Sequence, residues 1–151
     1  MIYFLIIILG IVIDRISKIY AYKFLIENTI KIPLFSFYYL ENKGAAFGIL
    51  QNHRFLFLTF TILVIVFLLF YFIKNRDRNS KFIKLAISFI ISGALGNLYD
   101  RIVSGYVIDF IYTNLFPFAV FNFADVFVVL GCIMMIIYLF LEDDNDSKHR
   151  K

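Results

Sequence analysis

Hydrophobic residues along this chain form long runs rather than the short alternating patterns of soluble domains. The run at 55–73 contains no charged residue, and those at 82–103 and 118–141 are interrupted by only a few. Residues 2–22 are apolar as far as Ile13, after which charged residues appear. A bilayer core about 30 Å thick requires roughly 20 apolar residues per helix. The pattern therefore predicts four transmembrane helices.

The composition also indicates a membrane protein. Hydrophobic residues make up 62% of the 151 positions and charged residues 17%, whereas a typical soluble domain has roughly half and a quarter. A soluble fold of this size could not bury so much apolar surface. Twenty Phe and ten Tyr exclude a disordered chain. We expect a single all-α membrane domain over residues 1–151.

The positions of Lys and Arg predict the orientation of the spans. Five basic residues follow the second span and three lie in the C-terminal tail, whereas residues 105–117 contain none and the longer loop 23–54 contains four. By the positive-inside rule, both termini are expected in the cytoplasm. The alternative of a cleavable signal peptide at residues 2–22 is disfavoured, because this segment lacks a basic start and a small-residue cleavage site.

The loop 23–54 is too long to be a simple connector. Residues 30–40 have the β-branched and aromatic content of strands, and Pro33 would confine a strand there to the edge of a sheet. A small, turn-prone segment, residues 42–48, follows. We expect a small extracytoplasmic β-sheet lying on the membrane surface.

Polar residues inside the predicted spans fall at one depth. At 1.5 Å per residue, Asp14 lies about 18 Å, Asp100 about 27 Å and Asp125 about 24 Å from the cytoplasmic side. Ionisable groups in a bilayer are costly and point to function by default, so we expect a polar site in the outer leaflet. Gly93 and Gly96 remove bulk from the third span, which predicts close approach of another helix.

Asp109 and Asp125 are the candidate catalytic groups. If their side chains meet in a low-dielectric site, the two like charges would share a proton. One carboxyl group would then act as a general base toward water and the other as an acid toward a carbonyl oxygen. The alternative is that each Asp only forms an ion pair with Lys18 or Arg101, and the spacing alone does not decide between the two.

Other chemistries find little support. Cys132 is the only cysteine, and His53 and His149 lie far apart in the sequence, so we expect no disulfide, no metal site and no cofactor. The net charge of +4 follows the membrane topology, and no nucleic-acid partner is expected. Nothing in the sequence points to an oligomer, and a monomer is expected.

Five polar motifs follow one another along the chain. They are Asp14-Arg15-Ile16-Ser17-Lys18, Asn42-Lys43-Gly44-Ala45-Ala46-Phe47-Gly48, Gly96-Asn97-Leu98-Tyr99-Asp100-Arg101, Val107-Ile108-Asp109-Phe110 and Phe121-Asn122-Phe123-Ala124-Asp125. With these motifs in this order, nearly the whole sequence resembles the lipoprotein signal peptidase family, also called signal peptidase II. The chain departs from the family pattern at Arg15, where a neutral polar residue is frequent, and at Tyr99, where an aliphatic residue is common.

The resemblance implies an aspartic endopeptidase of the bacterial cytoplasmic (inner) membrane, with its active site toward the extracytoplasmic leaflet. Such enzymes remove signal peptides from prolipoproteins, cutting N-terminal to the diacylglyceryl-modified Cys, and globomycin-type peptides inhibit them. The implied fold has four transmembrane helices, a small sheet and a short surface helix, and the implied partners are prolipoproteins and membrane lipid. Matching motifs make Asp109 and Asp125 the catalytic pair. The residues implied to shape the pocket or hold substrate are Asp14, Lys18, Asn42, Gly44, Asn97, Asp100, Arg101, Asn122 and Ala124.

Two functions of other classes compete with this expectation. A small ion-coupled transporter could use Asp14 or Asp125 as a proton carrier. A proton relay across the bilayer would need ionisable groups at several depths, whereas those of this chain fall at one depth. A noncatalytic scaffold could use the polar residues only to hold helices together, but it would leave Asp109 without a purpose.

Overall fold

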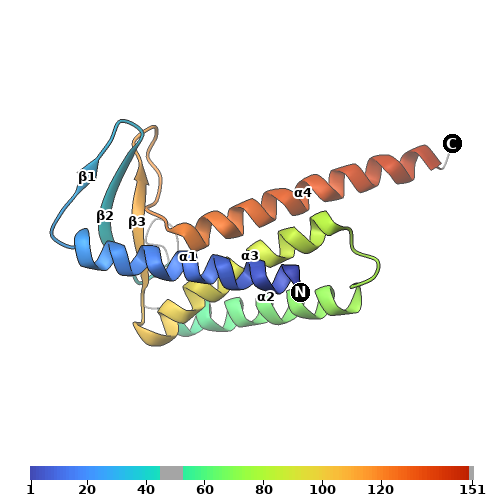
Figure 1. Cartoon of the computed structure of the whole chain (residues 1–151), viewed down its shortest axis with the longest axis horizontal. Coiled ribbons are helices and arrows are strands. Elements are labelled where there is room, and N and C mark those ends of the chain that lie inside the picture. The colour runs from blue at the N-terminus through green and yellow to red at the C-terminus, as the bar shows by residue number, and fades with distance from the viewer. Residues whose placement is uncertain (45–52, 150–151) are drawn as a thin grey trace.

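The computed structural model describes residues 1–44 and 53–149, with side chains up to residue 141. Four long helices lie lengthwise beside one another, and a small sheet stands at one end of them (Figure 1). α1 begins and α4 ends at the side away from this sheet. In chain order the elements are α1 (Ile2–Phe24), β1 (Ile30–Lys31), β2 (Phe35–Asn42), α2 (Arg54–Lys74), α3 (Lys81–Val103), β3 (Val107–Thr113) and α4 (Phe123–His149).

The chain is a helical protein of the membrane type. Within the described residues, three helices are long and apolar enough to cross a bilayer: α2, α3 and the Phe123–Leu141 part of α4. α1 is 23 residues long and carries Asp14, Arg15, Lys18 and Lys23. Asp14 and Lys18 are fully buried, so these two charges face the inside of the helix bundle.

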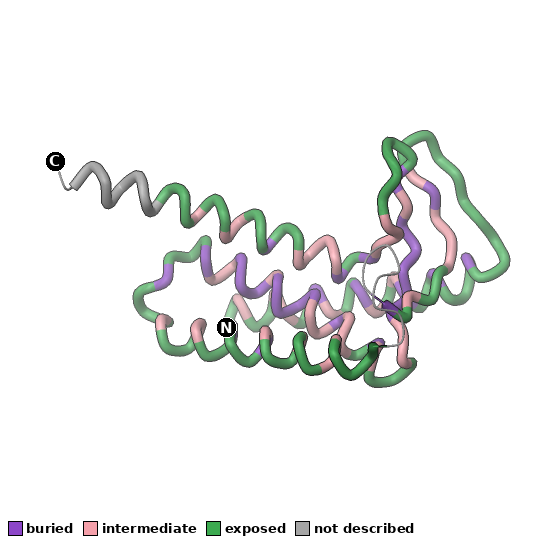
Figure 2. Tube along the Cα trace, turned by 180° about the vertical axis from the view of Figure 1, so that it is seen from behind, coloured by how far each residue is buried: buried purple, intermediate pink, exposed green. Residues whose placement is uncertain are grey.

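α3 occupies the centre of the bundle and packs against α1, α2 and α4. It is the most buried of the three apolar helices (Figure 2). A Cβ atom on Gly93 would lie 2.1 Å from the backbone oxygen of Ala124, and one on Gly96 would lie 2.6 Å from the Asp14 carboxylate. The prediction of a close helix approach at these glycines is thereby confirmed, because neither site has room for a side chain.

The sheet is antiparallel, with the strand order β1-β2-β3. β1 lies in the segment predicted to form strands, residues 30–40, and β2 begins there but continues to Asn42. Pro33 lies between the two strands. β3 is a strand that the sequence analysis did not predict, since the chain from 105 to 117 was considered only as an outer connection. Its residues are nearly all buried, and part of it packs against Ala21 and Leu25 at the end of α1.

Two other segments differ from what the sequence predicts. The fourth helix begins at Phe123 rather than at residue 118, because Phe121 pairs with Ile111 of β3 through two backbone hydrogen bonds of 2.9 Å. The predicted surface helix is absent from the described residues, and residues 45–52 lie outside them.

Replacing Gly93 by Ala should destabilise the fold, because the new methyl group meets a backbone oxygen of α4 that cannot rotate away. We expect a loss of about 1–3 kcal/mol in the free energy of unfolding, measured by denaturant titration in detergent micelles. Ile102→Ala in the same helix is the control, since Ile102 is 54% exposed. Equal stability of Gly93→Ala and the parent would contradict the close approach of α3 and α4.

Candidate active site

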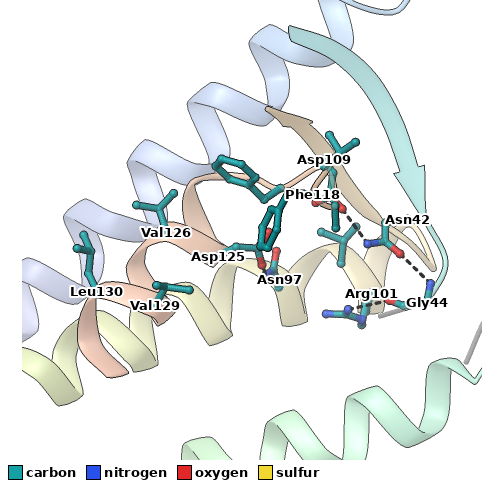
Figure 3. Close-up of a pocket in the computed structure, with 14 residues that line it drawn as sticks. Asn42, Gly44, Asn97, Arg101, Asp109, Phe118, Asp125, Val126, Val129 and Leu130 are labelled. Atoms are coloured by element: carbon teal, nitrogen blue, oxygen red, sulfur yellow. Dashed lines mark hydrogen bonds between the residues drawn. The ribbon is translucent and has the colours of Figure 1, made fainter. Parts of the chain in front are cut away.

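A cleft of about 460 Å³ opens where β3 and the end of β2 meet α3 and the start of α4. Asp109 and Asp125 both line this cleft (Figure 3). They come from different elements, β3 and α4, and only the fold brings them to one cavity. Four other residues singled out in the sequence also line it: Asn42, Gly44, Asn97 and Arg101.

β3 fixes the position of Asp109. Successive residues of a strand point to opposite faces, so Ile108 and Phe110 pack in the hydrophobic core with α1 while Asp109 faces the cleft. The Asn42 amide donates a hydrogen bond to Asp109 Oδ2 (2.8 Å). The Asn122 amide donates one to Oδ1 (2.6 Å). Both carboxylate oxygens of Asp109 are therefore oriented by neutral donors.

Asp125 lies in the first turn of α4, where a reciprocal pair of hydrogen bonds holds it. The Asn122 backbone N–H donates to Asp125 Oδ2, and the Asp125 N–H donates to Asn122 Oδ1, each at 3.0 Å. This is the capping-box arrangement. The Asn97 amide of α3 donates to Asp125 Oδ1 (2.7 Å). A helix N-terminus favours a negative group, so the local structure suits a carboxylate at this position.

Asn122 connects the two carboxylates directly. Its amide nitrogen donates to Asp109, while its amide oxygen and backbone nitrogen bond to Asp125. Asn122 and Asp125 stand three residues apart, and they meet as a helix cap rather than on one helix face, because the helix begins one residue after Asn122. Through one fully buried side chain, the two acids are held in a fixed relation.

Burial, first of all, and the nearby charge of Asp125 raise the pKa of the Asp109 carboxyl group, which comes to about 7 with all its surroundings included. The hydrogen bonds from Asn42 and Asn122 and the charge of Lys18 act the other way and offset part of this rise. A carboxyl group with a pKa near 7 can hold or release a proton at neutral pH, as a general acid or base must.

A cluster of buried charges lies behind the cleft. The Lys18 ammonium is 2.9 Å from Asp14 Oδ2 and 2.8 Å from Asp100 Oδ2. It also donates to Asn97 Oδ1 (3.0 Å). Five residues singled out in the sequence are buried and do not line the cavity: Asp14, Lys18, Asp100, Asn122 and Ala124. Their contacts support the residues that do.

The ion pairs of this region do not include the two cleft carboxylates. In the part of the chain that the structure describes, Asp109 and Asp125 form no salt bridge, and Lys18 pairs with Asp14 and Asp100 instead. Arg101 lines the cleft, donates to the Gly44 carbonyl (3.4 Å) and stacks over the Phe57 ring. The alternative that Lys18 or Arg101 simply neutralises each Asp is therefore not what the structure contains.

Sequence reasoning missed the apolar wall of the cleft. Val126, Val129 and Leu130 lie on α4 beyond Asp125 and extend the cavity along the helix (Figure 3). Their spacing places them on one face, and this spacing, counted from Asp125, is the signal that could have revealed them. No group of three or more His, Cys, Asp or Glu side chains suited to a metal ion occurs in the described residues.

Comparison with known proteins identifies the family. A family model described as signal peptidase (SPase) II matches residues 6–141. The chain belongs to the signal peptidase II family. It is therefore an aspartic protease by family. It is similar to the lipoprotein signal peptidase of Clostridium novyi, with 50% identity covering 91% of this chain and 97% of the relative. For that of Clostridium tetani the identity is 44%, covering 95% and 96%.

Solved structures agree with this assignment. The fold is similar to that of a bacterial membrane enzyme determined by the in meso method at 2.3 Å resolution. The TM-score is 0.88 at 36% identity, covering 95% of this chain and 90% of the other. A second bacterial membrane enzyme, determined at 1.9 Å, gives a TM-score of 0.82 at 35% identity, covering 91% of each chain.

Asn122→Ala should damage stability and activity together, because it removes the cap of α4 and the amide that orients Asp109. We expect a loss of about 2 kcal/mol in the free energy of unfolding and of about 100-fold in peptidase activity. Ser80→Ala is the matched control: Ser80 caps α3 by accepting from Ile83 N–H (3.2 Å), away from the cleft. It should cost about 1 kcal/mol and leave activity intact. Equal effects of both variants on activity would refute the bridging role.

Proposed function

We propose that this chain removes signal peptides from prolipoproteins, cutting N-terminal to the diacylglyceryl-modified Cys with Asp109 and Asp125 as its catalytic dyad. The observation that carries the proposal is the single cleft lined by both carboxylates and oriented by one shared amide, Asn122. The name of the curated relatives, lipoprotein signal peptidase, supports the substrate class. No metal and no cofactor take part in the proposed reaction.

In the proposed reaction a water molecule lies between the two carboxyl groups. Asp125 takes a proton from the water as its oxygen attacks the carbonyl carbon of the scissile bond, while Asp109 donates a proton to the carbonyl oxygen. Collapse of the tetrahedral intermediate breaks the C–N bond, and the leaving nitrogen receives the proton that Asp125 holds. The proton on the hydroxyl group of the intermediate returns to Asp109, which restores the starting state.

The other cleft residues are suited to hold a peptide. Asn42, Asn97 and Arg101 provide hydrogen-bond donors at the cavity, and we assign to them the binding of the extended backbone around the scissile bond. Gly44 leaves space at the cavity edge. The apolar wall formed by Val126, Val129 and Leu130 suits the lipid-bearing part of the substrate, since it continues from Asp125 along a membrane-crossing helix. Globomycin-type peptides would occupy the same cleft.

We further propose that α1 is a fourth span and that both termini are cytoplasmic. Asp14 and Lys18 are turned into the bundle and paired, so the helix exposes mainly apolar residues. The basic residues between α2 and α3 belong to the cytoplasmic side by the positive-inside rule. This orientation puts the sheet and the cleft toward the extracytoplasmic leaflet of the cytoplasmic membrane. We also propose that the protein acts as a monomer, because the described part of one chain supplies both carboxylates of the cleft.

Asp109→Asn and Asp125→Asn should each abolish cleavage, since an amide can neither accept the proton from water nor donate one to the carbonyl oxygen. We expect a loss of at least about 1000-fold in the cleavage of a diacylglyceryl-modified prolipoprotein by protein that remains folded. The parent should prefer this substrate to its unlipidated form and should keep its activity in the presence of a chelator. Full activity of either variant would defeat the dyad, and no preference for the lipidated form would defeat the substrate assignment.

The pH dependence should follow the proton on Asp109. Because this group acts as the acid and its pKa is raised to about 7, kcat/KM should fall as the pH rises through about 7. Asn42→Ala removes a hydrogen bond that stabilises the ionised carboxylate. The pKa of Asp109 should then rise, and the alkaline limb of the profile should move to higher pH. A shift to lower pH in this variant would contradict the assignment of Asp109 as the acid.

A further inference from the structure

Arg15 is a charged residue of α1 to which the proposed reaction gives no role. Its guanidinium pairs with Asp100 Oδ1. Its central carbon lies 4.6 Å from the centroid of the Tyr99 ring. Asp100 is buried, whereas Arg15 is 26% exposed. The guanidinium is thus held between a buried carboxylate and an aromatic face, two partners that it reaches only in this folded arrangement.

The buried cluster is electrically balanced only when Arg15 is included. Asp14 and Asp100 carry two negative charges, and Lys18 carries one positive charge that lies within 3 Å of both carboxylates. Arg15 supplies the second positive charge. Unpaired charge is expensive in a low-dielectric interior. Without Arg15, Lys18 would be the only cation of the described residues in an ion pair with the two buried carboxylates.

From this cluster two short paths lead to the dyad. Lys18 donates to Asn97 Oδ1 (3.0 Å), and the Asn97 amide nitrogen donates to Asp125 Oδ1 (2.7 Å). Because Lys18 fixes which end of the Asn97 amide is the acceptor, the nitrogen must face Asp125. The second path runs from Asp100 Oδ2, which accepts from the Ile108 N–H at 3.4 Å, one residue before Asp109.

We propose that Arg15, seated on Tyr99, is a positioning residue for the peptidase reaction. By neutralising Asp100 it keeps Lys18 directed at Asn97, and Asn97 in turn directs its amide at Asp125. Tyr99 acts only through Arg15, by holding the guanidinium at Asp100. The inference rests on the proposed dyad and adds to it the residues that fix its charge and orientation from behind.

The charges around the dyad determine the sign of the expected pH effect. The charged groups around the dyad come from several elements. α1 contributes Asp14, Arg15 and Lys18, and α3 contributes Asp100 and Arg101. The dyad itself consists of Asp109 of β3 and Asp125 of α4, and the described part of β2 faces it with the neutral Asn42. Removing the Arg15 charge makes these surroundings more negative. The alkaline limb of the pH–rate profile, which follows the proton on Asp109, should then move to higher pH, because Asp109 gives up its proton less readily.

The experiment measures kcat/KM on a diacylglyceryl-modified prolipoprotein across the pH range, together with thermal unfolding of the full chain in detergent. Arg15→Gln should lower the maximal kcat/KM about tenfold and move the alkaline limb of the profile up by about half a pH unit. Arg15→Lys, which keeps the charge, should recover most of the rate and the parent profile. Tyr99→Leu should give a smaller shift in the same direction. The double variant Arg15→Gln/Tyr99→Leu should match Arg15→Gln alone.

Arg78→Gln is the control of equal charge change, because Arg78 is exposed in the connection between α2 and α3, and it should leave rate and profile unchanged. A parent-like profile in both Arg15→Gln and Tyr99→Leu would overturn the inference. The inference would also be overturned if Arg15→Gln lost rate and stability but kept the pH–rate profile of the parent, since that result indicates a purely structural role. If Asp109→Asn and Asp125→Asn are inactive while Arg15→Gln is parent-like, this inference alone fails. If either Asp variant is active, the proposed function fails first.

Discussion

Every charge placed inside a low-dielectric bundle requires a partner, and this requirement organises the structure. α1 contributes Asp14, Arg15 and Lys18 to the bundle, and Asp100 of α3 forms ion pairs with both Arg15 and Lys18. Removing one partner of a buried pair typically costs about 3–5 kcal/mol, so each of these residues constrains the others. The register of α1 against α3 is therefore fixed by electrostatics as well as by the close packing at Gly96.

At the cleft the same requirement is met in a different way. Asp109 and Asp125 accept hydrogen bonds from the amides of Asn42, Asn97 and Asn122, and the cations Lys18 and Arg15 are held one layer behind. A directly paired cation would stabilise the ionised form strongly and keep a carboxyl group permanently charged. Neutral donors orient the oxygens and still allow a proton to be held, which agrees with the raised pKa of Asp109.

Much of the fold could be predicted from the sequence, because the apolar runs report on the bilayer directly. Three of the runs correspond to α2, α3 and α4, and the polar residues of the motifs do gather in one region. The start of α4 was misplaced, since the apolar residues before Phe123 suit a strand as well as a helix, and the backbone pairing of Phe121 with β3 decides between them. Local pattern contains no information about such a long-range pairing.

The sequence predicts which residues belong to the site, but not which of them line the cleft and which lie behind it. Asn97 and Asp100 stand three residues apart in α3, which is the spacing of one helix side, yet only the fold separates Asn97, which lines the cleft, from Asp100, which lies behind it. Arg15 and Tyr99, the two departures from the family pattern, contact each other in the structure. In the sequence they are far apart, so nothing there connected them.

Nearly every residue of the motif at 121–125 makes a specific contact, because β3, α3 and α1 all meet the chain at the start of α4. Phe121 pairs with β3, Asn122 bonds to Asp109 and Asn97, and the Ala124 N–H donates to Asp14 Oδ1 of α1 (3.1 Å). Ala124 is also fully buried against α3. A Cβ atom placed on Gly96 of α3 would lie 3.3 Å from the Cβ atom of Ala124. A larger residue at position 124 would separate α4 from both helices. It would move Asp125 away from Asn97, so the small side chain beside the acid is required by packing before any contact with substrate is considered.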